Sequence, residues 1–194
     1  MMFKRLYFSI SLSIFSFLSL SNAAPKDLWT KQFGTTEWDK ANSVTTDPSG
    51  NIYVVGYINR TLPGQKSLGK GDVFVRKYDF NGKELWTQQF GTNGEDTAAS
   101  VTTDPKGDIY VAGLTEGTFS GQKFLGKSDA FIRKYDTNGK EVWTKQLGTS
   151  GDDTATSVTT DPNGNIYVAG ITYGTFPGQT NLGGFDAFLY KFTL

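Results

Sequence analysis

Neither cysteine nor histidine occurs anywhere in this sequence of 194 residues. Without cysteine the protein has no disulfide bond and no thiolate nucleophile. Without histidine it lacks the imidazole that enzymes use most often as a general base, and zinc loses both of its usual ligands. Any metal ion would have to be a hard cation held by oxygen atoms, and the composition predicts no cofactor.

An excess of charge of one sign is also missing. The 19 basic and 19 acidic side chains give a formal net charge of zero, so a nucleic-acid partner is not expected. Glycine and aromatic residues, by contrast, are plentiful, with 23 Gly, 15 Phe and 9 Tyr. This composition is typical of short strands joined by tight turns, and the length suits one domain with a sizeable core.

No apolar run is long enough to span a bilayer. Residues 6–20 are apolar apart from interleaved serines, but this run is shorter than the ~20 residues that a membrane helix needs. Two basic residues precede it, and Ser21-Asn22-Ala23 follows it with small residues suited to cleavage. The pattern predicts a secretory signal peptide over residues 1–23. We therefore expect residues 24–194 to be exported to the periplasm, the cell surface or the medium, with an uncleaved membrane anchor as the alternative.

A unit of 57 residues recurs three times in the sequence. Residues 43–56 return almost unchanged at 100–113 and at 157–170. Three tryptophans keep the same step, and so do two sets of aspartates; they are Trp29, Trp86 and Trp143, then Asp39, Asp96 and Asp153, then Asp47, Asp104 and Asp161. A whole supersecondary unit is therefore repeated, over residues 29–85, 86–142 and 143–194.

Each repeat contains four runs rich in β-branched and aromatic residues. In the first copy they are residues 44–46, 52–55, 73–78 and 84–90. Short Asp/Gly turns at 47–50 and 79–82 join them in pairs, which predicts four antiparallel strands and no helix. Both turns fall at one end of the sheet. The longer connections, such as 91–99 and 115–128, fall at the other end, where binding sites on β folds usually lie.

The second strand of each unit has no charged side chain on either face, as residues 109–112 show. A sheet of this kind must be covered on both sides. Stacking of the sheets against one another would provide that cover, and a single unit could not stand alone.

The repeated letters resemble a known family. Asp-x-x-x-Ser-Val-x-x-Asp-x-x-Gly-x-Ile-Tyr-Val-x-Gly, followed by Asp-x-Phe-x-x-Lys-Tyr-Asp-x-x-Gly and a Trp-bearing strand, is similar to the SBBP beta-propeller repeat. The resemblance covers nearly all of residues 29–194. It implies an all-β propeller of four-stranded antiparallel blades, bacterial export and no defined reaction. Propellers typically have four to eight blades, so three units are too few for an ordinary ring.

The predicted strands at the two ends of the sequence suggest how a ring is completed. Residues 28–33 match the fourth strand of a unit, and residues 186–192 form a third strand with no fourth strand after it. We expect three blades per chain with a permuted closing strand, and a homodimer in which two exchanged strands complete a six-bladed ring. An open piece of a longer repeat array, or another mode of association, is the alternative. Three four-stranded units also suit a three-fold β-prism or trefoil-like lectin.

Acidic residues precede the first strand of each unit. They are Glu37 and Asp39, Glu95 and Asp96, and Asp152 and Asp153. If the first strand lines a propeller axis, these carboxylates could ring one mouth of the channel and favour a cation. Alternatively, the repeated aspartates accept hydrogen bonds from their own loops. Paired carboxylates could also serve a glycosidase, although identical residues in every unit fit architecture better than a single active site.

The remaining candidates are aromatic or lie in turns. Asp47, Asp104 and Asp161 resemble the start of a calcium loop but lack its later ligands, so they are interpreted as turn formers. Trp29, Trp86 and Trp143 are expected to pack the blades. Trp38 has no counterpart in the other units and is a candidate ligand contact.

These features favour a non-catalytic exported binding or scaffolding module. It would present its loop-rich face to a protein, a glycan or a cation. The alternative from another class is a propeller enzyme that acts on polysaccharide through carboxylates.

Overall fold

The computed structural model describes residues 24–193, and the predicted signal peptide lies outside them. The chain divides into two units, Met1–Thr30 and Lys31–Leu194. Residues 24–30, the described part of the first unit, form neither helix nor strand. Among the residues that the structure describes, no helix is long and apolar enough to cross a membrane.

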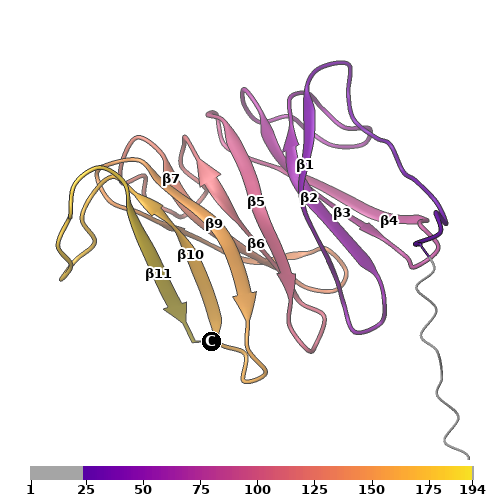
Figure 1. Ribbon diagram of the computed structural model, residues 1–194. Helices are drawn as coiled ribbons and strands as arrows, with labels where there is room; N and C mark the ends of the chain where they lie inside the picture. Colours follow the sequence, from indigo (N-terminus) through magenta and orange to yellow (C-terminus); the bar gives the residue numbers. More distant parts are fainter. Residues whose placement is uncertain (1–23, 194) are drawn as a thin grey trace, which may run out of the picture. The chain divides into compact units, whose positions relative to one another are not determined.

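The second unit consists of strands and their connections. In chain order the strands are β1 (Asp39–Thr46), β2 (Ile52–Ile58), β3 (Asp72–Tyr78), β4 (Glu84–Phe90), β5 (Asp96–Thr103), β6 (Ile109–Thr115), β7 (Asp129–Tyr135), β8 (Glu141–Leu147), β9 (Asp153–Thr160), β10 (Ile166–Thr172) and β11 (Asp186–Phe192). They form three antiparallel sheets: a first sheet β1-β2-β3-β4, a second sheet β5-β6-β7-β8 and a third sheet β11-β10-β9 (Figure 1). The all-β class predicted from the sequence is confirmed.

One predicted strand is absent from the single chain. Residues 28–33 were expected to be a strand, but no strand is assigned anywhere in residues 24–38. A strand needs a partner for its backbone N–H and C=O groups, and this segment pairs with no strand of the described chain. The prediction of a strand there is therefore wrong for one isolated chain.

The first turn of each repeat has the structure that its letters predict. The N–H of Gly50 donates to the carbonyl of Asp47 at 2.9 Å, and Gly50 has a φ of 81°. Glycine adopts this left-handed conformation without steric cost. The corresponding turns at 104–108 and 161–165 have the same backbone hydrogen bond.

A bulge in the first strand of each sheet requires a glycine on the neighbouring strand, because the two backbones approach each other closely there. The pairing of β5 with β6 shifts register between Ala98 and Ser100. At this point a Cβ on Gly113 would collide with the carbonyl of Thr97 and lie 2.9 Å from the Cα of Ala98. Only glycine lets the two strands approach this closely, and Gly56 occupies the same position in the first sheet.

The core lies between neighbouring sheets, as the uncharged second strands predict. Val101 of β5 belongs to a buried cluster with Tyr53, Val55 and Val75 of the first sheet. One step along, Val158 of β9 belongs to a cluster of the second sheet. β5 and β9 therefore each cover a face of the sheet before them.

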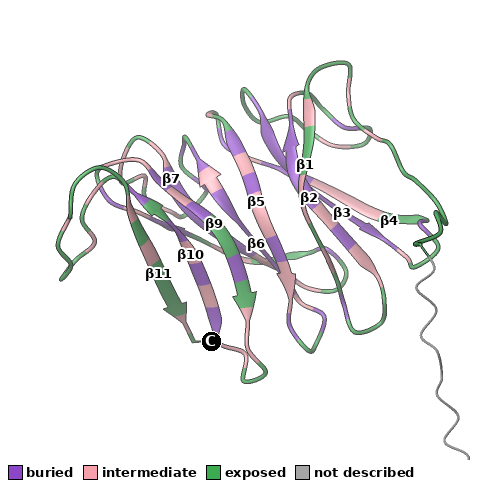
Figure 2. Ribbon diagram, in the orientation of Figure 1, coloured by how far each residue is buried: buried purple, intermediate pink, exposed green. Residues whose placement is uncertain are grey.

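The third strands show how much this cover contributes. Every residue of β3 is buried, and so is every residue of β7 except one. No residue of β11 is buried, although its sequence follows the same pattern (Figure 2). The difference arises because β3 and β7 have an outer strand beside them and a following sheet over them, whereas in the described chain β11 has neither.

Candidate functional site

Alternating strand directions place the connections of the sheets at two opposite ends (Figure 1). The short turns within each repeat lie at one end, called the turn end. Residues 59–71, 116–128 and 173–185, together with the links 91–95 and 148–152, lie at the other, called the loop end. Five of the ten connections lie at the loop end, but they hold about two-thirds of the connecting residues, as expected from the sequence.

Aspartates at the loop end bind the loops that precede them. Asp96 accepts hydrogen bonds from the backbone N–H of Thr92 at 2.5 Å and from its hydroxyl at 3.0 Å. Asp153 accepts the same pair from Thr149, at 2.6 and 2.9 Å. Both carboxylates are fully buried. They hold their loops in place, which is the alternative role that the repetition suggested.

The other acidic residues of this end are separate from one another. Asp39 is half-buried and accepts hydrogen bonds from the loop before it. The carboxylate of Glu37 forms an ion pair with Arg60 at 3.2 Å on the surface. Glu95 is exposed and Asp152 is half-buried. That any of these side chains binds a cation or another ligand stays a prediction.

A buried glutamine of the fourth strand joins the loop end to the sheet. The Nε2 of Gln89 donates to Asp72 at 2.7 Å and to the carbonyl of Arg60 at 3.0 Å, while its Oε1 accepts from the N–H of Leu62 at 2.9 Å. The N–H of Gln89 itself donates to the side chain of Gln65 at 3.0 Å. One side chain thus anchors a long loop at several points.

The second sheet repeats this anchor. Gln146 donates to Asp129 and to the carbonyl of Gly117, both at 2.8 Å, and accepts from Phe119 at 3.2 Å. Neither these glutamines nor the aspartates that they contact were predicted as site residues from the sequence. The signal was present, because Gln32, Gln89 and Gln146 keep the step of 57 residues, as do Asp72, Asp129 and Asp186.

Two carboxylates approach each other between adjacent sheets. A Cβ on Gly148 would lie 2.8 Å from an oxygen of Asp153 and 3.0 Å from an oxygen of Asp129, so both side chains border the same small space. Both residues are fully buried, and each has a carboxylate oxygen without a hydrogen-bond partner among the described residues. A substrate cannot reach this pair, so it does not suit glycoside hydrolysis.

Burial governs the protonation of these groups. Burial raises the pKa of Asp129, the hydrogen bonds from Leu125 and Gln146 lower it in part, and the charge of Asp153 raises it further. The pKa of Asp96 is raised by the same cause, with a smaller contribution from Asp72. The folded protein therefore favours a proton on Asp129 and on Asp96 more than the unfolded chain does.

At the turn end, Asp47 is saturated by its own hairpin. Its two oxygens accept from the N–H groups of Ser49 and Asn51, both at 2.9 Å, from the side chain of Asn51 at 2.8 Å and from the hydroxyl of Tyr53 at 2.9 Å. Burial alone would raise its pKa, but these hydrogen bonds together lower the pKa below its usual value. Asp161 makes the equivalent contacts, and Asp104 makes all of them except the one to an amide side chain, because residue 108 is an aspartate. The predicted role as turn formers agrees with this geometry.

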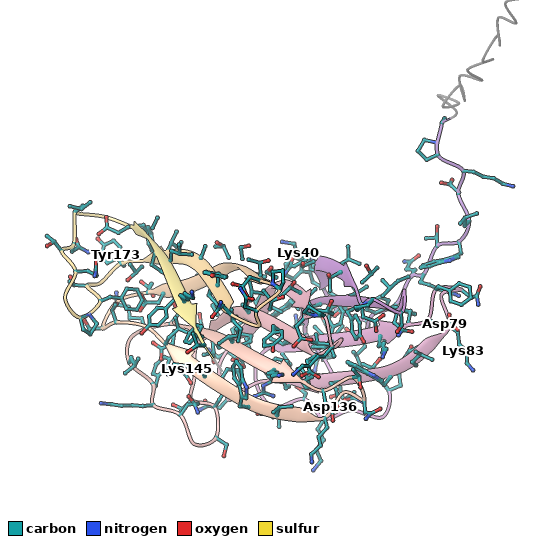
Figure 3. The ribbon with its side chains drawn as sticks, turned by 90° about the horizontal axis from the view of Figure 1, so that it is seen from below. Lys40, Asp79, Lys83, Asp136, Lys145 and Tyr173 are labelled. Atoms are coloured by element: carbon teal, nitrogen blue, oxygen red, sulfur yellow. The ribbon has the colours of Figure 1, made fainter. Side chains whose placement is uncertain are left out.

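The three turns surround a shallow hollow at this end. It is lined by Thr46, Asp47 and Pro48 and their repeats Thr103, Asp104, Pro105, Thr160, Asp161 and Pro162. Seen from this end, Figure 3 shows Asp79 and Lys83 at the β3–β4 turn and Asp136 at the β7–β8 turn, on the opposite side of the sheets from Lys40 of β1. The hollow thus lies among the turns of the first strands, with its aspartates already hydrogen-bonded.

Trp86 and Trp143 pack within the sheets. The ring centroid of Trp86 lies 6.0 Å from that of Tyr53, and Trp143 lies 6.2 Å from Tyr110. A Cβ on Gly139 would lie 2.9 Å from the indole of Trp86, so this ring also contacts the β7–β8 turn of the next sheet. Trp29, in the first unit, is exposed.

Two pairs of non-repeated aromatic residues lie at the loop end. Trp38 is exposed and its ring is 5.5 Å from that of Tyr57. At the third sheet, Tyr173 and Phe185 are exposed and pack edge to face with centroids 5.1 Å apart. The interpretation of Trp38 as a ligand contact stays a prediction.

One leucine is exposed at the same place in every long loop. Leu68, Leu125 and Leu182 each donate a backbone N–H to the aspartate four residues later, at 3.0, 2.8 and 2.8 Å. These bonds fix the backbone and leave the three side chains in solvent. We call them the leucine row. The leucine row was not predicted from the sequence, although its members are spaced by 57 residues.

Comparison with known proteins adds a family. The profile of the SBBP beta-propeller repeat matches residues 28–62, 85–119 and 142–177, more than half of the chain. An uncharacterized WD repeat-containing protein of Acanthamoeba polyphaga mimivirus is 30% identical over 79% of this chain and 14% of its own length. The regulatory protein FlaEY of Caulobacter vibrioides is 27% identical over 76% of this chain and 17% of its own length. The chain thus spans less than a fifth of either relative.

Proposed function

The chain belongs to the SBBP beta-propeller repeat family, and from that premise we propose that it is an exported, non-catalytic binding module that presents its loop end to a protein partner. The leucine row carries this proposal. Exposed apolar side chains scattered singly need no explanation, but three held at equivalent places on one face by fixed backbone hydrogen bonds form a prearranged contact surface.

The charges around the leucine row indicate the chemistry of the partner. Lys66, Lys70, Lys123 and Lys127 are all exposed in the two loops that carry Leu68 and Leu125. A partner surface with an apolar centre and an acidic border would complement this arrangement.

The repeated carboxylates support a binding role over an enzymatic one. Asp96 and Asp153 are buried and bound to their loops, and Asp47 is saturated by its turn. A cation at the loop end has less support, because Glu37 already pairs with Arg60. Relatives whose names describe WD repeats and regulation also accord with a role in binding.

The test replaces the leucine row and keeps the fold. The purified chain is incubated with exported proteins of its source, cross-linked and analysed by mass spectrometry, beside the triple variant Leu68→Ser, Leu125→Ser and Leu182→Ser. We expect a defined partner to be lost with the triple variant and retained with Leu85→Ser, which removes an exposed leucine from β4. Equal recovery with all three proteins would contradict the proposal.

Export rests on residues 1–23 and has its own measurement. The protein recovered from outside the cytoplasm should begin at Ala24, as determined by N-terminal sequencing. A chain that keeps Met1 and stays with the membrane would favour the uncleaved anchor instead.

A further inference from the structure

The outer edge of β11 borders a groove of about 590 Å³. In the first two sheets, β4 and β8 occupy this position beside β3 and β7. Gln89 and Gln146 of those strands bind four groups: a carbonyl, an N–H, a glutamine side chain and an aspartate. In the third repeat the same four groups belong to Gly174, Phe176, Gln179 and Asp186, and all four residues line the groove.

These groups form a seat for one more glutamine. The carbonyl of Gly174 accepts from the hydroxyl of Thr172 at 3.5 Å and from Asn181 at 3.0 Å. Its counterpart Gly117 accepts from Thr115 and from Gln146, so Asn181 holds the place of the glutamine donor and would give way to an incoming one. Phe176 and Asp186 are only half-buried, whereas Phe119 and Asp129, their counterparts in the second sheet, are buried. The seat is therefore built but not filled by a glutamine of the described chain.

Residues 28–33 have a sequence that matches the strands whose glutamines fill the equivalent seats. They read Leu-Trp-Thr-Lys-Gln-Phe, against Leu-Trp-Thr-Gln-Gln-Phe in β4 and Val-Trp-Thr-Lys-Gln-Leu in β8. Gln32 is exposed, in contrast to the buried Gln89 and Gln146. The pairs Gln89–Phe74 and Gln146–Phe131 set the register, which would place Gln32 opposite Phe188 of β11.

Phe33 shows which sheet this segment belongs to. Its ring is 5.2 Å from that of Phe74, and the guanidinium of Arg76 lies 4.1 Å from its centroid. Phe90, at the end of β4, makes the same contacts with the following sheet, 5.8 Å to Phe131 and 3.9 Å to Arg133. Phe33 therefore packs on the first sheet as the end of the outer strand of a preceding sheet.

Two complementary apolar faces lie where such a preceding sheet would pack. Val44 of β1 is 64% exposed, whereas its equivalents Val101 and Val158 are 5% exposed under the sheet before them. On the third sheet, Leu189 is 72% exposed, although its equivalent in the first sheet, Val75, is fully buried. The first sheet thus has no preceding sheet beneath β1, and the third sheet has no following sheet over β11. The two uncovered faces are the two halves of one sheet-to-sheet contact.

The loop end differs from the repeat pattern at the same place. Inside the chain, parallel bridges join Gly71 to Glu95 and Ser128 to Asp152 across adjacent repeats. The residues in line for the next such bridge are Phe185 and Trp38, both aromatic and exposed. Small and acidic residues at the internal joints are thus replaced by large apolar ones at the outer joint.

From these observations we propose that two copies of this chain join reciprocally. Residues 28–33 of each copy add a fourth strand to the third sheet of the other, and the first sheet of each covers β11 of the other. The complex has two equivalent joints and six sheets, within the range of ring sizes that propellers adopt. Within one chain the same joint would require a ring of only three sheets, fewer than the four to eight that propellers typically have. The joint uses β11, the first sheet and residues 28–33, and of the leucine row only Leu182 borders its groove.

The first test measures mass. Light scattering on the purified chain at micromolar concentration should give twice the mass of one chain, and either a monomer or a larger polymer would overturn the proposal. Val44→Asp places a charge in the joint, so we expect the dimer dissociation constant to rise at least about a hundredfold. Val142→Asp is the matched control, because Val142 of β8 is 53% exposed and lies outside the joint. A Val44→Asp variant as dimeric as this control would refute the assignment.

Gln32→Ala is a second variant that tests the joint even if Val44→Asp does not fold. Gln32 is exposed in the single chain, so its removal should leave the circular dichroism spectrum of the monomer unchanged. The glutamine seat would be left empty, and we expect at least about tenfold weaker association. Lys31→Ala, one residue away, is the control, and equal affinities of the two variants would overturn the register.

A disulfide fixes the pairing directly, since the natural chain has no cysteine. The pairs Gln88–Val75 and Lys145–Ile132 predict that residue 31 lies opposite residue 189 of the other copy. The double variant Lys31→Cys and Leu189→Cys should therefore migrate as a covalent dimer under oxidising conditions. Lys31→Cys with Tyr190→Cys is one residue out of register and should remain largely uncrosslinked. A disulfide closed within one chain, or no disulfide in the matched pair, would exclude the exchange.

Discussion

At the scale of single residues, one buried carboxylate can accept several hydrogen bonds at once. Asp47 satisfies two backbone N–H groups, an amide and the buried hydroxyl of Tyr53. The ammonium of Lys77 also lies 3.9 Å from it. The loss of this carboxylate would leave several buried polar groups without partners at once.

We expect Asp47→Ala to lower the free energy of unfolding by about 2–4 kcal/mol. Tyr53→Phe removes only one of the same hydrogen bonds and should cost about 1 kcal/mol. Urea denaturation of both variants beside the natural protein measures the difference. Equal costs would mean that the hydroxyl bond alone, and not the saturated turn, accounts for the effect.

The buried carboxyl pair predicts a pH dependence. The pKa of Asp129 is raised in the folded state by burial and by Asp153, from an unfolded value of about 4. At a pH between the unfolded and the folded pKa, the folded protein holds a proton that the unfolded chain has released. The contribution of Asp129 to stability is therefore greatest below the unfolded pKa and is lost as the pH rises through the raised folded pKa. Asp129→Asn keeps an acceptor for Leu125 and Gln146 and removes this loss.

Urea denaturation between pH 4 and pH 8 checks the sign. The stability of Asp129→Asn relative to the natural protein should improve as the pH rises. Glu116→Gln also removes one negative charge, but from an exposed side chain, and should show no such trend. A trend of the opposite sign for Asp129→Asn would mean that hydrogen bonds, and not burial, dominate at this site.

At the scale of strands, the bulge in each first strand controls how the sheet is built. The backbone of β5 approaches Gly113 so closely that a methyl group there would overlap the carbonyl of Thr97. Gly113→Ala should therefore lower the free energy of unfolding by about 2–4 kcal/mol, because backbone cannot move aside as a side chain can.

Gly164→Ala provides the comparison for that variant. Gly164 has a φ of 82° but open space around its Cα, so alanine there should cost only about 1 kcal/mol for the left-handed backbone. Thermal denaturation of the two variants separates crowding from backbone strain. Equal losses would show that the bulge tolerates a side chain.

The strands differ in how far the sequence predicts them. β4 and β11 coincide with runs of β-branched and aromatic residues, and their bounds could be predicted. The start of β5 could not, because Asp96-Thr-Ala-Ala has small or polar side chains and resembles a loop. These residues become strand because β6 offers a ladder and the bulge accommodates the irregular spacing.

The candidate site shows the same limit. The carboxylates, tryptophans and turns at the loop end and the turn end could be found from the 57-residue step. The step alone did not reveal that Gln89 is buried or that Asp129 faces Asp153. Those facts depend on how one sheet lies against the next, which no local pattern records.

At the scale of the whole molecule, stability should depend on protein concentration. If two copies complete each other's third sheet, mass action favours the folded dimer. A tenfold increase in concentration is worth about 1.4 kcal/mol. At about 2–4 °C per kcal/mol, this gives a rise of several degrees in the melting temperature.

Differential scanning calorimetry at several concentrations measures this shift. The Val44→Asp variant, designed to remain monomeric, should melt at one temperature throughout the series. A natural protein whose melting temperature does not change over a hundredfold range would indicate that the single chain carries all of the stability.

The contact of Phe33 with Phe74 and Arg76 has a consequence for how such proteins can be encoded. It reproduces the junction that Phe90 makes between two repeats on the same polypeptide. If the proposed exchange occurs, the junction does not depend on covalent continuity, and a gene in which two copies are fused in tandem should yield a protein with one outer junction instead of two. On the same condition, the number of repeats per gene could change as long as the number of sheets in the complex is kept.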